Sequence, residues 1–448
     1  MNLLEQFTSP PSSDYAILLR IILIISLLIF IPFISILFGG TSLSVYFYSK
    51  GKKMNNPVYM RFSKDILDKL TISRNVSYGV GLLPLLAVIF LYVQLLYGAK
   101  LISVSLFIIS FILYSIGFYF IYKFKNNFYL ENIFKTFKEK LPEKSFPEIE
   151  NNFEEIYITK NLSNARIGLS LLAFATFFFT GGNVIAGNIE LWNSVDNVFT
   201  LFVNGNIWLN YITFIVTSFS ITGVVILYFF FIWQGGITGD DKEYSEFVKR
   251  IAGWTALIAT MVQPVFLFLC FIFSLQISLS PTVFIITAFL IFAILIICNL
   301  LYAVIKNSEL KYSPVIIFLV FAVMTFNIIK DQSMFANSAK VHFLSVNKKA
   351  EEMINKKAGE NLNVAGVNPE EIFNTKCSAC HKFDVKLVGP PYQETIPKYN
   401  NDVKKLSAFI YNPQKINTAY PPMPNQGLKQ KEADAVAQWL ISKVSGKK

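Results

Sequence analysis

The sequence predicts an all-α protein, in which an eight-helix transmembrane bundle is followed by a small helical C-terminal domain. Hydrophobic residues make up 53% of the 448 residues and charged residues only 15%. Most of the apolar residues before residue 330 fall in long runs, and the chain then becomes polar and lysine-rich. A Cys-Ser-Ala-Cys-His motif follows at 377–381. We therefore expect a transmembrane domain at 1–330, a polar tether at 331–365 and a separate domain at 366–448.

Eight apolar runs are long enough to cross a bilayer as helices, which takes about 17 to 25 mainly apolar residues. The expected spans are 16–48, 76–98, 101–122, 167–188, 208–233, 251–277, 281–305 and 313–329. Gly39 and Gly40 lie inside the first span, where small residues favour close helix contact or a kink.

Basic residues indicate the orientation of these spans, because Lys and Arg gather in cytoplasmic loops. Twenty of them lie in the connections 49–75, 123–166, 234–250 and 306–312. The N-terminal end and the alternate connections hold only Arg20 and Lys100. Both termini are therefore expected outside the cytoplasm. This predicts a multi-pass protein of the cytoplasmic (inner) membrane with its C-terminal domain on the periplasmic side.

The motif at 377–381 is typical of covalent attachment of a c-type haem. Cys377 and Cys380, three positions apart on a helical turn, can reach the two vinyl groups of one porphyrin edge. His381 follows at once and points a ring nitrogen at the iron. The alternative is a redox or metal CxxC followed by an accidental His. A zinc site needs more ligands, and the chain has only four cysteines and two histidines, so we expect one covalent haem c.

The residues around the motif resemble class I cytochrome c over about 366–446. Asn-Pro-Glu-Glu at 368–371 has the N-cap Asn and first-turn Pro of a helix that leads into the motif. Lys429–Val444 predicts an amphipathic closing helix. The resemblance implies that these first and last helices cross, with Phe373 against Trp439.

The same resemblance implies the remaining iron ligands. Leu-Val-Gly-Pro-Pro at 387–391 is similar to the family's proximal loop, where the carbonyl of Pro390 would accept the ring proton of His381 and orient it. Tyr-Pro-Pro-Met-Pro at 420–424 implies Met423 as the distal ligand. The alternative for Met423 is a core-filling side chain. A His–Met pair is the iron ligation of electron-transfer cytochromes c.

A second resemblance lies in the membrane part. Asn-Pro-Val-Tyr at 56–59, and the stretch from Lys64 to Gly81, are similar to the first connection of subunit I of cytochrome bd-type oxidases. The haem-ligating histidines of that family have no counterpart, because no histidine precedes His342. The relation would imply that haem chemistry in the bundle is lost or is supplied by a partner subunit.

These observations predict a membrane-anchored c-type cytochrome. It would pass single electrons between a membrane-bound, quinol-linked respiratory complex and a periplasmic acceptor, as an electron-transfer subunit of an oxidoreductase complex. No catalytic residue is assigned to this chain. The alternatives are a bd-like oxidoreductase subunit whose membrane part handles quinol, and a redox-sensing membrane protein. The expected partners are further membrane subunits of the complex and a soluble or membrane-bound redox protein. A quinone ligand for the bundle stays open, and no motif supports nucleic-acid binding.

Overall fold

The computed structural model describes residues 13–97, 99, 102–140, 159–195, 197–233, 242–274, 276–307, 310–363, 368–416 and 420–445. Every regular element within these residues is helical. The chain divides into two compact units, Met1–Val346 and Asn347–Lys448, and each is treated separately below.

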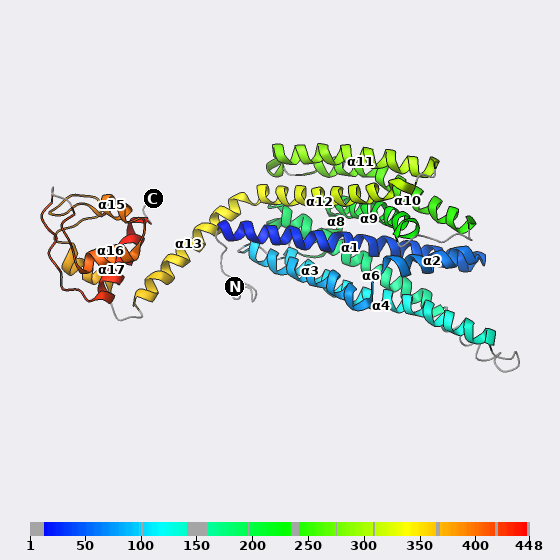
Figure 1. Cartoon of the computed structure of the whole chain (residues 1–448), viewed down its shortest axis with the longest axis horizontal. Helices are drawn as coiled ribbons and strands as arrows, with labels where there is room; N and C mark the ends of the chain where they lie inside the picture. The colour runs from blue at the N-terminus through cyan, green and yellow to red at the C-terminus, as the bar shows by residue number, and fades with distance from the viewer. Residues whose placement is uncertain are drawn as a thin grey trace. The chain divides into compact units, whose positions relative to one another are not determined.

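Eight helices of the first unit are long and apolar enough to cross a membrane, which confirms the predicted fold class. They are α1 (Ser13–Met54), α3 (Arg74–Leu95), α4 (Ile102–Lys140), α6 (Thr159–Gly187), α9 (Gly205–Phe231), α10 (Lys242–Ile272), α11 (Pro281–Asn307) and α12 (Ser313–Ser338). Figure 1 shows these helices running side by side along the length of the bundle. Most extend beyond the expected spans because their polar ends continue the helix outside the apolar run.

Short helices join the long ones. They are α2 (Pro57–Leu70), α7 (Leu191–Ser194), α8 (Phe199–Val203), η4 (Gln276–Ser278) and η5 (Leu310–Tyr312). The start of α2 is fixed by Asn56, whose side chain accepts hydrogen bonds from the backbone N–H groups of Val58 and Tyr59. Phe62 and Ile66 on its apolar face are buried, so α2 packs against α1 instead of crossing the membrane as a separate helix.

The bundle has two main apolar cores. One lies among α1, α3, α4 and α6, and the other among α9, α10, α11 and α12 with α2. At Gly39 a side chain would meet the backbone oxygen of Ser218 at 2.8 Å and the Thr222 side chain as well. The prediction of close helix contact is thus confirmed at Gly39, because only glycine lets α1 and α9 approach this closely.

The last long helix, α12, continues past residue 330 to Ser338. Its buried face carries Met324, Ile328 and Phe335, which lie four and seven residues apart, so the helical pattern does not stop with the apolar run. A further helix, α13 (Lys340–Asn363), covers much of the segment expected to be a tether. The polar composition did not specify the conformation of this segment, and residues Lys340–Asn363 are helical.

The second unit is a small helical domain built from α14 (Pro369–Ile372), η6 (Phe373–Cys377), α15 (Tyr392–Thr395), η7 (Ile396–Tyr399), α16 (Val403–Tyr411) and α17 (Gln430–Ser445). The closing helix α17 packs against both α14 and α16. The rings of Phe373 and Trp439 lie 5.0 Å apart, which confirms the predicted contact between the first and last helices. Both rings belong to the apolar core of this second unit, in which Cys377 is also buried.

Candidate haem-attachment site

The two thiols lie at the end of a short helix that has an N-cap at its start and a π-helical turn at its end. The side chain of Asn368 accepts hydrogen bonds of 3.2 Å from the backbone N–H groups of Glu370 and Glu371, as the sequence predicted for this N-cap. At the other end, the N–H of Ser378 donates to the carbonyl of Phe373 over 2.8 Å, which makes η6 a single π-helical turn. Such turns interrupt α-helices most often at functional sites.

Cys377, Cys380 and His381 lie together just after this turn. The backbone N–H of His381 donates to the carbonyl of Cys377 over 3.0 Å, and that of Cys380 donates to the same oxygen over 3.2 Å. Cys377 is buried and Cys380 is partly exposed, and both are free thiols. Two thiols and an imidazole are therefore held on one continuous stretch of backbone.

The loop at 387–391 fixes the imidazole. The N–H of Gly389 donates to the carbonyl of Cys380 over 2.9 Å, which ties the loop to the motif. Nδ1 of His381 lies 2.9 Å from the carbonyl oxygen of Pro390. A carbonyl can only accept, so Nδ1 carries the proton and Nε2 keeps its lone pair for a metal. A hydrogen bond of this kind sets the orientation and the basicity of a ligand histidine.

Two residues that the sequence interpretation did not single out complete the support of His381. A side chain at Gly389 would lie 2.6 Å from both ring nitrogens of His381, so only glycine fits at this position. The ring centroid of Tyr392 lies 5.1 Å from that of the His381 imidazole. The Gly-Pro-Pro-Tyr order in the sequence was the available signal for both residues.

The segment that carries Met423 lies beside the motif. The Nζ atom of Lys376 donates to the backbone carbonyl of Gln426 over 3.0 Å, and Lys386 lies over the ring of Tyr420 at 4.8 Å. Met423 itself is partly exposed. Among the described residues, hydrogen bonds connect Cys377, Cys380 and His381 with the loop that contains Pro390. No described hydrogen bond or ring contact connects Met423 with His381. Its role as the distal ligand stays a prediction.

Burial keeps the walls of the site uncharged. It raises the pKa of the Cys377 thiol, and the nearby Lys376 only partly opposes this shift. It also raises the pKa of the Tyr392 hydroxyl. Both groups are therefore neutral at neutral pH. A set of two free thiols, one imidazole with an available Nε2 and an apolar surround fits a covalently attached haem.

Comparison with known proteins identifies this domain. The family model for cytochrome c matches residues 368–443. The cytochrome c-551 of Pseudomonas denitrificans is 35% identical over 77 residues, which cover 94% of that protein and 16% of this chain. The chain belongs to the cytochrome c family. Its cytochrome domain is also similar to the cytochrome c-551 of Pseudomonas aeruginosa (33% identical, 76% of that protein, 17% of this chain).

A cytochrome c-552 of Hydrogenobacter thermophilus is another relative, 35% identical over 69 residues, which cover 70% of that protein and 15% of this chain. These relatives align with the C-terminal domain alone, so nothing in them supports the resemblance of the bundle to bd-type oxidases. No solved structure matches the chain. The chain is thus a membrane protein that carries a cytochrome c domain, which implies a covalent haem c and electron transfer.

Proposed function

We propose that this chain is a membrane-anchored c-type cytochrome that passes single electrons between a quinol-linked respiratory complex in the membrane and a periplasmic acceptor. The observation that carries the proposal is the 2.9 Å contact between Nδ1 of His381 and the carbonyl of Pro390, next to the paired thiols Cys377 and Cys380. The eight apolar helices on the same chain supply the membrane anchor.

Each residue of the site has a defined task in this proposal. A bound haem c supplies a one-electron iron couple. Cys377 and Cys380 would hold it by thioether bonds, and Nε2 of His381 would bind the iron. The carbonyl of Pro390 keeps the Nδ1 proton of His381 and so holds the ring in one orientation. Met423 is proposed as the sixth ligand, on a loop that flanking prolines stiffen.

The charge pattern supports the side of the membrane on which this domain works. The connections that would face the cytoplasm carry 20 of the basic residues, which favours a periplasmic C-terminal domain. Residues 334–448 carry 17 Lys against 10 acidic residues, so this C-terminal segment would attract an acidic redox partner at long range.

A haem count on the native assembly tests the proposal. The complex is purified from its membrane, its haems are measured as pyridine haemochromes, and its subunits are identified by mass spectrometry. We expect one haem c for each copy of this chain, together with further membrane subunits. A chain that carries no covalent haem, or a purified assembly in which this chain stands alone and donates to no acceptor, would overturn it.

A further inference from the structure

The transmembrane bundle contains a partly open cavity of about 260 Å³ that the cytochrome function does not explain. Residues of α1, α3, α6, α9, α10, α11 and α12 line it, so it lies between helices and not on one face of the bundle. Pockets for whole drug-sized ligands measure roughly 300–1,000 Å³. The cavity therefore suits one small ring system.

An ion pair lies on the wall of this cavity. Nζ of Lys330 is 3.1 Å from Oδ1 of Asp331 and donates to Oδ1 of Asn327 over 2.9 Å. Lys330 is only 8% exposed. The Asp331 side chain is 56% exposed, so the pair lies where the apolar run ends. Because Asp331 balances Lys330, the wall is close to neutral overall and does not select for a charged ligand.

Gln332 begins a chain of hydrogen bonds beside the cavity, and the acceptor atom of its side chain is left without a partner among the described residues. The Nε2 atom of Gln332 donates to the hydroxyl of Tyr92 over 3.2 Å, and that hydroxyl donates to Oδ1 of Asn183 over 3.2 Å. Gln332 is 7% exposed, and among the described residues its Oε1 is buried with no hydrogen-bond partner. Buried polar atoms are nearly always hydrogen-bonded, so this acceptor is available to a donor that enters the cavity.

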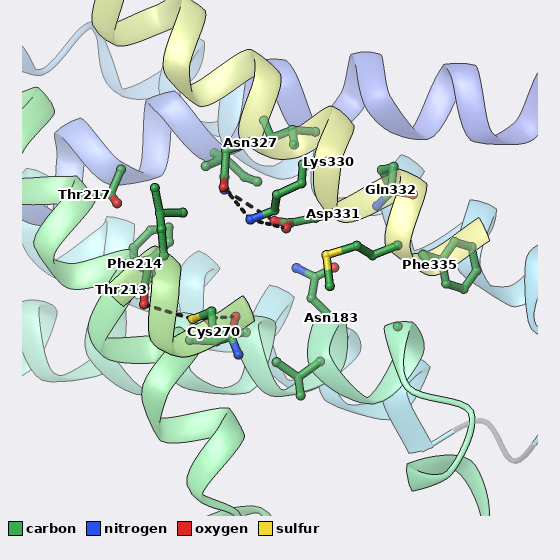
Figure 2. Close-up of a pocket in the computed structure, with 18 of the residues that line it drawn as sticks. Asn183, Thr213, Phe214, Thr217, Cys270, Asn327, Lys330, Asp331, Gln332 and Phe335 are labelled. Atoms are coloured by element: carbon green, nitrogen blue, oxygen red, sulfur yellow. Dashed lines mark hydrogen bonds and ion pairs between the residues drawn. The ribbon is translucent and has the colours of Figure 1, made fainter. Parts of the chain in front are cut away.

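Figure 2 shows how these groups face the cavity. Lys330, Asp331 and Gln332 come from α12, Asn183 comes from α6, and Cys270 comes from α10 across from them. Aliphatic side chains form much of the remaining wall, and aromatic side chains such as Phe214 and Phe335 complete it. The site thus combines apolar walls for a ring with a few polar groups that can accept and donate hydrogen bonds.

We propose that this cavity binds the ring of a membrane quinol. A quinol is neutral, is delivered through the bilayer, and carries hydroxyl groups on an aromatic ring. One hydroxyl donates to Oε1 of Gln332, and the ring packs against Phe335 and its aromatic neighbours. This inference rests on the proposed function, because the cytochrome domain needs a source of electrons in the membrane.

Binding of two quinol probes to the full-length holoprotein tests the proposal. The protein is placed in quinone-free lipid nanodiscs, and decylubiquinol and menadiol are titrated under anaerobic conditions. We expect saturable binding of at least one probe, with one molecule per chain. Gln332→Met keeps the side-chain length but removes the acceptor, and should weaken binding about tenfold, the value of one hydrogen bond.

Matched controls separate this effect from general damage. Gln94→Met makes the same change outside the cavity lining and should bind as the wild type does. If Gln332→Met fails to fold, Asn183→Leu replaces it, with Asn299→Leu as its control, since Asn299 is exposed and bonds only within its own helix. Wild-type protein without saturable binding of either probe, or cavity variants that bind as tightly as their controls, would overturn the proposal.

The cytochrome function is measured separately with ascorbate, which reduces a haem directly. Reduction by ascorbate and reoxidation by an acceptor, without quinol binding, would refute the quinol site and leave the proposed function intact. Absence of covalent haem would refute the proposed function whatever the titration gives.

Discussion

Replacing Gly389 by alanine should change the reduction potential of the cytochrome without removing any ligand. The new Cβ would lie 2.6 Å from Nδ1 and Nε2 of His381 and closer still to its Cε1, whereas ordinary contacts begin at 3.4 Å. The imidazole must therefore retreat by more than 0.8 Å, the shortfall at the two nitrogens. A retreat away from the loop would stretch the 2.9 Å contact between Nδ1 and the carbonyl of Pro390 beyond hydrogen-bonding range.

The lost hydrogen bond sets the size of the effect. Such a bond is worth about 1 kcal/mol net, and it makes the imidazole a stronger electron donor that favours ferric iron. Its loss should raise the potential of Gly389→Ala by roughly 40 mV, since a one-electron couple changes by about 59 mV for each tenfold in equilibrium constant. Spectroelectrochemistry of the full-length protein measures this shift.

A matched glycine variant serves as the control for this experiment. A Cβ added at Gly205 would meet no other atom within 4 Å, so Gly205→Ala should leave the potential unchanged. A Gly389→Ala protein with full haem content and the wild-type potential would refute this prediction. It would mean that the position of the His381 imidazole does not depend on the absence of a side chain at Gly389.

Three further substitutions test the site. Met423→Ala should lower the reduction potential and let CO bind the reduced haem, and an unchanged spectrum and potential would remove Met423 from the ligand set. The double variant Cys377→Ala with Cys380→Ala should lose all haem that survives denaturation, and covalent haem remaining there would contradict the attachment assignment. Trp439→Ala should lower the unfolding free energy of the cytochrome domain by about 3–5 kcal/mol, because it removes a buried ring that packs on Phe373. Thermal melting followed at the Soret band measures this change. An unshifted melting transition would contradict it.

The sequence predicted those features that depend on short stretches of chain. The N-cap at Asn368 and the order of the motif are local. The contact of Phe373 with Trp439 was implied by the resemblance to class I cytochrome c. The eight long helices were equally predictable, because each is an apolar run of bilayer length. No tertiary information was needed for the N-cap, the motif or the long helices.

The cavity was not predictable in this way, and its residues show why. Lys330 and Asp331 follow an apolar run, so hydropathy ends the span at 329, while the buried Ile328 and Phe335 keep the helix within the bundle to Ser338. The Gln332–Tyr92–Asn183 chain joins three helices that are far apart in sequence. Only the packing of the bundle brings these groups to one cavity.

The proposed site and the single haem motif together constrain how this chain works. A quinol gives up two electrons, whereas one haem accepts one at a time. The sequence carries a single CxxCH motif, and no histidine precedes His342 that could help to ligate a haem within the spans. The second electron therefore needs another carrier, supplied by a partner subunit or by a second copy of this chain. The haem count decides between them: haem b on an additional membrane subunit indicates a partner, and one haem c per chain with two chains in the assembly indicates a second copy.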